Sequence, residues 1–323
     1  MQAKFLFFTL AAVILAAPQT AAAQQSKIIW RIGYLATVSA FAIRDRYQAF
    51  RDGLRDLGYV EGKNIIIEAR FAEGKLERLP ELAAELVRLN VDVIVTSGPR
   101  STRAVKKSTS TLPIVMAEDP DPVASGLVAS LAQPGGNITG LSSLSPEIGG
   151  KRLEILKEVL PKLSRAAVFG AANSLLVSDI EPAAKVFAVQ LQYLDIRQSS
   201  DIETAFREAS RARAEAVMVL ENPVNLSHRK QIVALAVKSR LPAMYPWPEF
   251  VEEGGLMTYT ASRTDLFRRA ATFVDKILKG RTPADLPVEQ PMKFEFIINL
   301  IAAKQIGLTI PPNVLVRADR VIR

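Results

Sequence analysis

The chain has 323 residues, of which 41 are Lys or Arg and 33 are Asp or Glu, so its formal net charge is +8. It contains no cysteine and one histidine, His228. Without cysteine there can be no disulfide, thiolate metal site, cysteine nucleophile or acylated N-terminal cysteine. A histidine metal cluster or a Ser-His-Asp triad would have to use this single imidazole, so either is hard to assemble. The composition, 49% hydrophobic and 23% charged, is that of a globular chain, and the length favours two domains.

The first residues have the pattern of a secretory signal peptide. Lys4 precedes an apolar run from Phe5 to Ala17, and Ala21 and Ala23 form a small-x-small cleavage pattern. As a helix this run would span roughly 20 Å, which is short of the ~30 Å hydrocarbon core of a membrane. We therefore expect residues 1–23 to be cleaved, the alternative being an uncleaved anchor. Loss of Lys4 lowers the net charge from +8 to +7 in a mature chain exported to a bacterial periplasm.

From residue 28 onward, short β-rich runs alternate with amphipathic stretches, which is typical of βαβ units around a parallel sheet. In the stretch 44–57, Tyr47, Phe50, Leu54 and Leu57 recur at spacings of three and four residues and so share one face of a helix. The strands expected in the first half of the chain cover residues 29–35, 65–70, 91–96 and 113–117, and the helices residues 44–57, 76–89 and 102–108.

The same order of elements recurs in the second half. We expect strands at residues 165–170, 191–196, 216–220 and 241–245, and helices at 177–189, 201–213 and 227–240. Corresponding strands are separated by a nearly constant offset, which predicts two topologically equivalent lobes.

Segments 135–142 and 254–259, rich in glycine, close the two copies. A helix at 265–278, a strand-like run at 288–293 and a helix at 297–305 then follow. The predicted fold is α/β, with two Rossmann-like lobes built on parallel sheets and joined by a hinge of three crossings. We expect residues 28–141 with 259–287 to form the N-terminal lobe, and residues 145–255 with 292–323 to form the C-terminal lobe.

Six motifs occur in order along the chain, at residues 57–64 (LGYVEGKN), 91–98 (VDVIVTSG), 121–123 (DPV), 134–140 (PGGNITG), 249–257 (EFVEEGGLM) and 284–290 (ADLPVEQ). Together they resemble the ABC-transporter substrate-binding protein family that includes tryptophan- and tyrosine-binding members. The resemblance covers about residues 30–320 and implies a type I periplasmic binding protein fold that closes on a small solute and delivers it to a membrane permease. Members usually carry Gly before Asp-Pro-Val, whereas Pro120 stands here, and this leaves the ligand open.

Ligands of parallel sheets bind outside the carboxyl ends of the strands. The loops that follow the strands therefore supply the candidate binding residues. One wall of the expected site contains Ser39, Ser97, Gly98, Ser101 and Asp121, and the other Asn173, Asn222, Tyr245, Trp247 and Tyr259.

These residue types fit a small zwitterion with an apolar or aromatic side chain. The helix start after Ser97 offers free N–H groups to a carboxylate, Asp121 could accept from an ammonium, and Tyr245 and Trp247 could stack on the rest. Each feature also has an ordinary structural explanation: helix capping for the serines, turn formation for Asp121 and Asn173, and hinge or core packing for the rings.

Two other classes of function remain open from the sequence: a periplasmic α/β enzyme that uses the acidic loop from Glu118 to Asp121, and a solute sensor that feeds a signalling receptor. Phosphate-loop, zinc-protease and serine-hydrolase motifs are absent from the sequence. Basic residues are interspersed with acidic ones, so we expect no nucleic-acid partner, and His228 reads as a surface residue. We expect a monomer without enzymatic activity, metal or cofactor, whose transient partner is an ABC permease in the inner membrane.

Overall fold

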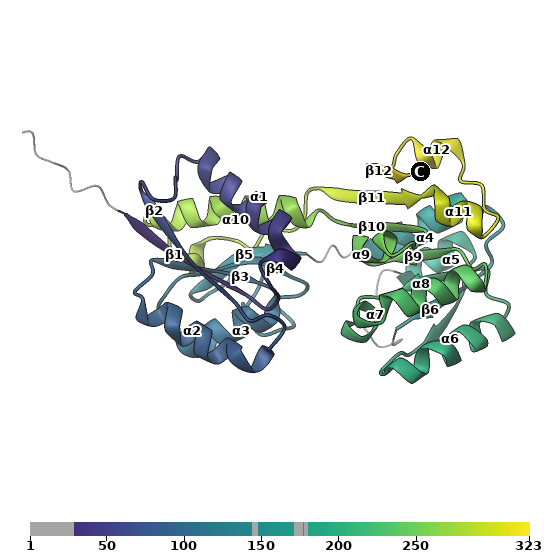
Figure 1. Cartoon of the computed structure of the whole chain (residues 1–323), viewed down its shortest axis with the longest axis horizontal. Coiled ribbons are helices and arrows are strands. Elements are labelled where there is room, and N and C mark those ends of the chain that lie inside the picture. Colours follow the sequence, from purple (N-terminus) through teal and green to yellow (C-terminus); the bar gives the residue numbers. More distant parts are fainter. Residues whose placement is uncertain (1–28, 144–147, 171–176, 178–179) are drawn as a thin grey trace, which may run out of the picture.

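The chain folds into two lobes, each built around its own β-sheet and linked to the other by segments that run between them (Figure 1). The structure is a computed structural model that describes residues 29–143, 148–170, 177 and 180–323. This arrangement confirms the predicted two-lobed α/β fold.

The first sheet has five parallel strands in the order β2-β1-β3-β4-β5. Its central strands β3 (Val93–Ser97) and β4 (Ile114–Asp119) are buried along their whole length because helices cover both faces. One face packs against α1 and α10, and the other against α2 and α3. The remaining elements are β1 (Trp30–Ala36), η1 (Phe41–Ile43), α1 (Arg44–Asp56), β2 (Ile65–Phe71), η2 (Leu76–Arg78), α2 (Leu79–Arg88), α3 (Pro99–Ser108), β5 (Ile138–Ser142), α10 (Arg263–Leu278) and η4 (Pro283–Asp285).

The second sheet has seven strands in the order β12-β11-β10-β9-β8-β6-β7. All neighbouring strands are parallel except β10 and β11, which are antiparallel. Its strands are β6 (Arg165–Phe169), β7 (Gln190–Leu194), β8 (Ala216–Val219), β9 (Ala243–Tyr245), β10 (Met257–Ala261), β11 (Phe294–Asn299) and β12 (Arg320–Ile322). Its helices are α4 (Ile148–Val159), α5 (Ile180–Phe187), α6 (Ser199–Arg211), α7 (Pro223–Ser227), α8 (Arg229–Lys238), α9 (Pro248–Glu252), α11 (Leu300–Gln305) and α12 (Pro312–Leu315).

The two sheets share one strand order, which confirms the internal repeat. Strands β7-β6-β8-β9-β10 reproduce β2-β1-β3-β4-β5, and both follow the doubly wound order in which the chain reverses direction beside the first strand. The extra strands β11 and β12 extend only the second sheet. The repeat therefore creates one reversal point in each lobe, between β1 and β3 and between β6 and β8.

Two predicted elements near the end of the chain are wrong. The strand-like run expected at 288–293 forms no strand, apart from an isolated bridge at Glu289. The sequence predicted a helix at 297–305, but residues 294–299 form β11 and the helix starts only at Leu300. A short apolar run is compatible with a strand or a helix, and periodicity alone cannot distinguish them. Here β10 provides the decisive partner, because Phe294 and Phe296 pair with Ala261 and Tyr259 across the antiparallel ladder.

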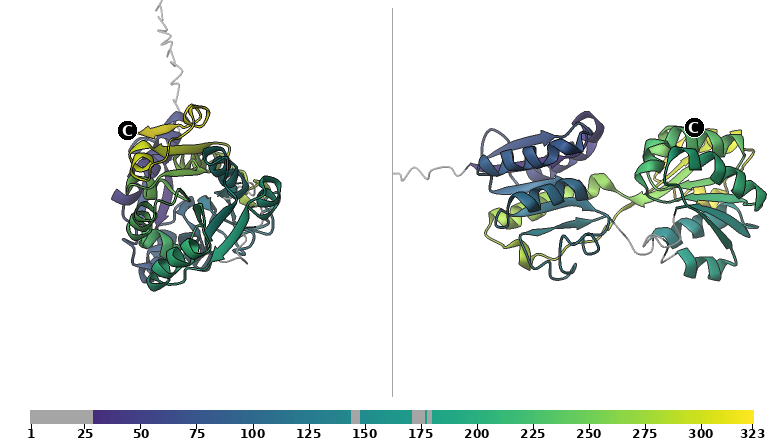
Figure 2. Two further views of the ribbon diagram at one scale, coloured as in Figure 1. Left: turned by 90° about the vertical axis from the view of Figure 1, so that its right-hand side faces the viewer. Right: turned by 90° about the horizontal axis from the view of Figure 1, so that it is seen from below.

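The chain crosses between the lobes after β5, after β10 and before β11 (Figure 2). Strand β10 continues in the second sheet to Ala261, whereas the Ala261 side chain packs in the core of the first lobe, so the boundary at residue 259 stays a prediction. Ser262, the residue that follows, donates its N–H to the oxygen of Lys293 at 2.9 Å. Two crossing segments are thus hydrogen-bonded to each other. The other domain boundaries stay predictions.

Helices α1 and α10 lie side by side on the first sheet, and a glycine permits their close contact. A Cβ atom on Gly53 of α1 would lie 2.4 Å from the backbone oxygen of Arg268 and 3.0 Å from the Cβ of Ala271. Both of these belong to α10, so a side chain at Gly53 would force apart the helix that carries the chain back into this lobe.

We therefore expect Gly53→Ala to lower the free energy of unfolding by about 2 kcal/mol, the usual cost of overpacking a core. Gly136→Ala is the matched control, because a Cβ there meets no atom within 4 Å. Urea denaturation of both variants measures the difference, and equal stabilities would contradict the role of this contact.

Candidate functional site

The carboxyl ends of the strands in the two lobes face each other (Figure 1). Strand β10 leads directly into α10 of the first lobe, and β9, β8, β6 and β7 run parallel to it. In the same way β5 leads toward α4 of the second lobe, and the strands of the first sheet are parallel to β5. The described loops at these strand ends therefore lie on the sides of the lobes that face each other, which is where such sheets bind ligands.

In the first lobe the structure brings Ser39, Ser97, Gly98 and Ser101 to these strand ends. Gly98 has φ +92° and forms the N-cap of α3, a conformation that other residues rarely adopt. The Ser101 hydroxyl is buried and donates to the oxygens of Ser97 (2.9 Å) and Gly98 (2.8 Å). The Ser39 hydroxyl accepts from the N–H of Ala42 at 3.2 Å. Both hydroxyls thus hold local structure, and backbone N–H groups at the start of α3 remain to serve an anion.

Asp121 lies beyond the end of β4 in a tight turn. Its Oδ1 accepts from the N–H of Ala124 at 2.9 Å, and its own N–H donates to Oδ1 of Asp119 at 3.0 Å. Turn formation therefore accounts for this oxygen of Asp121. The neighbouring Asp119 is fully buried, and its Oδ2 has no hydrogen-bond partner. Burial raises the pKa of Asp119 to about 6, although the N–H of Asp121 opposes this shift.

In the second lobe, Asn222 is the N-cap of α7. Its Oδ1 accepts from the N–H of Val224 at 2.7 Å and its Nδ2 donates to the oxygen of Ile196 at 2.9 Å. Trp247 is half-buried at the N-cap of α9, with its ring 6.4 Å from that of Phe250. Asn173 lies outside the described residues.

The prediction that Tyr245 stacks on a ligand is not supported by this structure. Tyr245 is fully buried in the core of the second lobe and stacks on Phe250 with the ring centroids 5.0 Å apart. Tyr259, on β10, stacks on Phe294 of β11 at 5.5 Å. The Tyr245 ring therefore packs within the lobe. The Tyr259 ring packs between β10 and β11, the strands next to two of the crossings.

The sequence prediction named Glu118 as part of the acidic loop but missed the cluster of charged side chains that it forms beside the crossings. Glu118, the penultimate residue of β4, accepts from Arg263 at 2.7 and 2.6 Å and lies 3.5 Å from Arg46 of α1. Burial alone would raise the pKa of Glu118, but the charge and hydrogen bonds of Arg263 hold it below its usual range. Glu249 of α9 lies 3.5 Å from Arg263 and 3.9 Å from Arg46. The cluster thus contains residues of both lobes.

A second carboxylate, Glu221, lies just beyond β8 at the reversal point of the second lobe. Its side chain is 23% exposed and stands 3.7 Å from Arg152. The Arg152 guanidinium also donates to the backbone oxygens of Tyr259 (2.7 Å) and Pro246 (3.1 Å). Burial raises the pKa of Glu221 despite Arg152, so its negative charge is incompletely compensated.

The sequence did contain a signal for these groups. Glu118, Glu221 and Arg263 each lie within two residues of the carboxyl end of a strand, the same rule that selected the serines. Their partners Arg46 and Glu249 come from helices, and only the tertiary arrangement brings them together.

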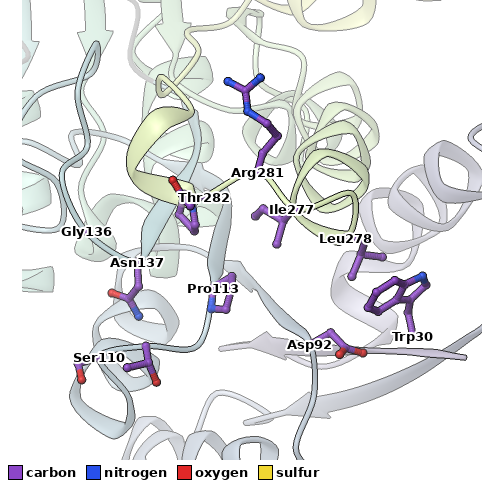
Figure 3. Close-up of a pocket in the computed structure, with 13 residues that line it drawn as sticks. Trp30, Asp92, Ser110, Pro113, Gly136, Asn137, Ile277, Leu278, Arg281 and Thr282 are labelled. Atoms are coloured by element: carbon purple, nitrogen blue, oxygen red, sulfur yellow. The ribbon is translucent and has the colours of Figure 1, made fainter. Parts of the chain in front are cut away.

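The amino ends of the first sheet carry a different feature, a cavity of about 640 Å³ (Figure 3). Its wall includes Trp30 at the start of β1, Asp92, Pro113 and Thr282. It lies at the opposite end of the strands from the loops described above.

Within the described ranges no cluster of three or more His, Asp or Glu could hold a metal ion. Among the residues that the structure describes, no helix is long and apolar enough to cross a membrane.

Comparisons with known proteins converge on one family. A family model described as ABC transporter substrate binding protein matches residues 31–322. A tyrosine-binding protein of Clostridioides difficile (strain R20291) is 27% identical over 257 residues, which make up 78% of this chain and 73% of the relative.

Two solved structures are similar over most of the chain. A conserved domain protein from Vibrio cholerae O1 biovar El Tor has a TM-score of 0.77 and 28% identity, covering 90% of this chain and 99% of its own. An ABC domain from Streptococcus pneumonia in complex with L-Trp has a TM-score of 0.76 and 25% identity, covering 91% and 99%. Their fold is that of the two lobes described above.

The buried Asp119 predicts a pH-dependent stability. Because its pKa is raised from 3.8 to about 6, the folded chain binds the proton more tightly than the unfolded chain, and the charged form destabilises the fold above pH 6. We expect Asp119→Asn, which keeps an oxygen for the N–H of Asp121, to raise the free energy of unfolding by about 3 kcal/mol at pH 8. The gain should vanish near pH 4.

Denaturation curves between pH 4 and pH 8 measure this difference. Asp45→Asn, the same substitution at an exposed position of α1, is measured in parallel as the control. A gain that is the same at pH 4 and pH 8 would show that Asp119 is not the titrating group.

Proposed function

Because the chain belongs to the ABC transporter substrate-binding protein family, we propose that it is an exported receptor for an amino acid with an aromatic or apolar side chain. Its two lobes close on the solute and present it to a permease of the inner membrane. The observation that carries this proposal is the opposition of two reversal points, since the carboxyl ends of both sheets face the space between the lobes. The tyrosine- and tryptophan-binding relatives support the class of ligand.

Three groups at the facing strand ends match the parts of such a ligand. Backbone N–H groups at the start of α3, after Ser97 and Gly98, would receive the carboxylate because the N-terminus of a helix favours anions. Glu221 would receive the ammonium, in place of Asp121, because it is partly exposed and its charge is incompletely compensated. The half-buried ring of Trp247 would pack on the side chain.

Closure is the proposed mechanism. A ligand held by α3 of the first lobe and by Glu221 and Trp247 of the second makes both sets of contacts only when the lobes approach. Binding therefore shifts the population toward the closed form. The periplasmic location rests on the predicted cleavage of residues 1–23, and we propose a monomer that releases its solute chemically unchanged.

An enzyme that uses the acidic loop is disfavoured by the same geometry. Arg263 holds the pKa of Glu118 low, so this carboxyl is a poor proton donor near neutral pH. Asp119 is fully buried, and one of its oxygens already accepts from Asp121. The carboxylates of this loop are therefore not arranged as an acid and base pair facing a substrate.

The ligand and its ammonium contact can be tested together by calorimetry on protein refolded to remove any bound solute. Wild-type protein should bind L-tryptophan or L-tyrosine. Glu221→Gln should weaken that binding by about 10- to 100-fold, the usual value of a hydrogen bond between charged groups. The variant should bind 3-indolepropionate, which lacks the ammonium, as the wild type does.

Glu203→Gln, an exposed change on α6 of the same lobe, is the control and should bind as the wild type does. If the wild type binds neither amino acid, the proposed ligand class is wrong. If Glu221→Gln weakens both ligands equally, the carboxylate does not contact the ammonium.

A further inference from the structure

Ion pairs connect the two lobes directly, apart from the crossing segments. Arg46 of α1 and Arg263 of α10 belong to the first lobe, whereas Glu249 belongs to α9 of the second. Among the described residues, the ion pairs that join a helix of one lobe to a helix of the other both end on Glu249. We call Arg46, Glu118, Arg263 and Glu249 the hinge cluster.

In the hinge cluster the ion pair of Arg263 with Glu118 within the first lobe is short, whereas the pairs between the lobes are long. Glu118 holds Arg263 at 2.6 and 2.7 Å, the spacing of a strong charge-assisted hydrogen bond. The distances from Glu249, 3.5 Å to Arg263 and 3.9 Å to Arg46, are both longer. In addition, Oε2 of Glu249 is buried and has no hydrogen-bond partner.

Arg46, the other arginine paired with Glu249, lies 3.5 Å from Glu118, so both of its ion pairs are long. Burial lowers the pKa of Arg46, and the nearby charge of Arg263 lowers it further. Oε1 of Glu249, which accepts from Arg263 at 3.5 Å, thus stands 3.9 Å from Arg46 of the other lobe. A relative movement of about an ångström would bring them to the usual hydrogen-bond distance.

Glu249 is also placed to respond to the ligand. It is the second residue of the short helix α9, whose N-cap is Trp247. Trp247 and Glu249 are thus two residues apart, so a movement of α9 toward the first lobe would carry both. On the other side, Arg263 directly follows Ser262, which is hydrogen-bonded to the adjacent crossing segment.

We propose that Glu249 is a positioning residue that closes onto Arg46 and Arg263 when the lobes approach, and thereby increases ligand affinity without touching the ligand. The inference rests on the proposed function, because it requires closure on a solute. Glu249 contributes to the ligand affinity by the difference in its ion-pair free energy between two forms. In the closed form the pairs are made, and in the open form they are long. Salt weakens it, since Arg46 and Glu249 are only partly buried.

The first test compares the affinity of L-tryptophan for wild type, Glu249→Gln, Arg46→Gln and the double variant. We expect each single change to weaken binding about tenfold and the double change to add little to either, as for two residues acting through one pair. Glu252→Gln is the matched control, because Glu252 lies on the same helix but pairs with Arg320 of its own lobe. Unchanged affinity in Glu249→Gln, equal loss in the control, or fully additive losses would each overturn the proposal.

The second test needs no ligand and separates this inference from the proposed function. Since the chain has no cysteine, Lys107→Cys on α3 and Glu208→Cys on α6 allow two dyes to be attached, one on each lobe. Single-molecule energy transfer should show fewer molecules at the short distance in Glu249→Gln than in wild type or Glu252→Gln. If wild type binds no amino acid but this difference is present, the ligand class fails and the positioning role stands. An unchanged distance distribution overturns the role of Glu249.

Discussion

The antiparallel pairing of β10 with β11 is the constraint on which the two-lobed arrangement depends. It places two crossing segments side by side, so the chain leaves the second lobe through β10 and returns through β11 on the neighbouring strand. Because β9, β8, β6 and β7 run parallel to β10, this one pairing also fixes the direction in which their carboxyl ends point. A parallel β11 would need a longer connection and would leave the two crossings apart.

The direction of the strands explains why charged side chains lie between the two lobes. Glu118, Glu221 and Arg263 all lie at carboxyl ends of strands, at the face where the lobes meet. Opposite charges nearby limit the cost of placing them there, since buried ions are tolerated only when they are paired. The pairing is complete around Glu118 but loose around Glu249 and Glu221. Loose pairing leaves room for a partner that arrives later, either a ligand or the other lobe.

Sequence periodicity predicted the elements well where one lobe alone determines them. Phe50 and Leu54 recur on one face and are indeed buried under α10, and the repeated strand order follows from local patterns of the same kind. Prediction failed where the partner comes from far along the chain. The strand β11 exists because β10 pairs with it, and Tyr245 is a core residue because it belongs to a cluster that includes the distant Phe169 and Val217. Glu249 has no local signal at all, since its partners Arg46 and Arg263 belong to the other lobe.

The two ends of the first sheet show how the chain separates packing from recognition. At the amino ends, Asp92 accepts from the N–H of Arg31, Asn137 donates to the oxygen of Leu112, and the Thr282 hydroxyl donates to Asp285. These cavity-lining groups already have hydrogen-bond partners within the lobe, so their polar atoms do not require a ligand. At the carboxyl ends, Oδ2 of Asp119 is buried without a partner, as is Oε2 of Glu249 across the gap. Unsatisfied buried groups destabilise a fold, and under the proposed closure Glu249 would gain a partner as the lobes approach. The absence of cysteine and the single histidine are consistent with the proposed recognition, which uses backbone amides, a carboxylate and one aromatic ring.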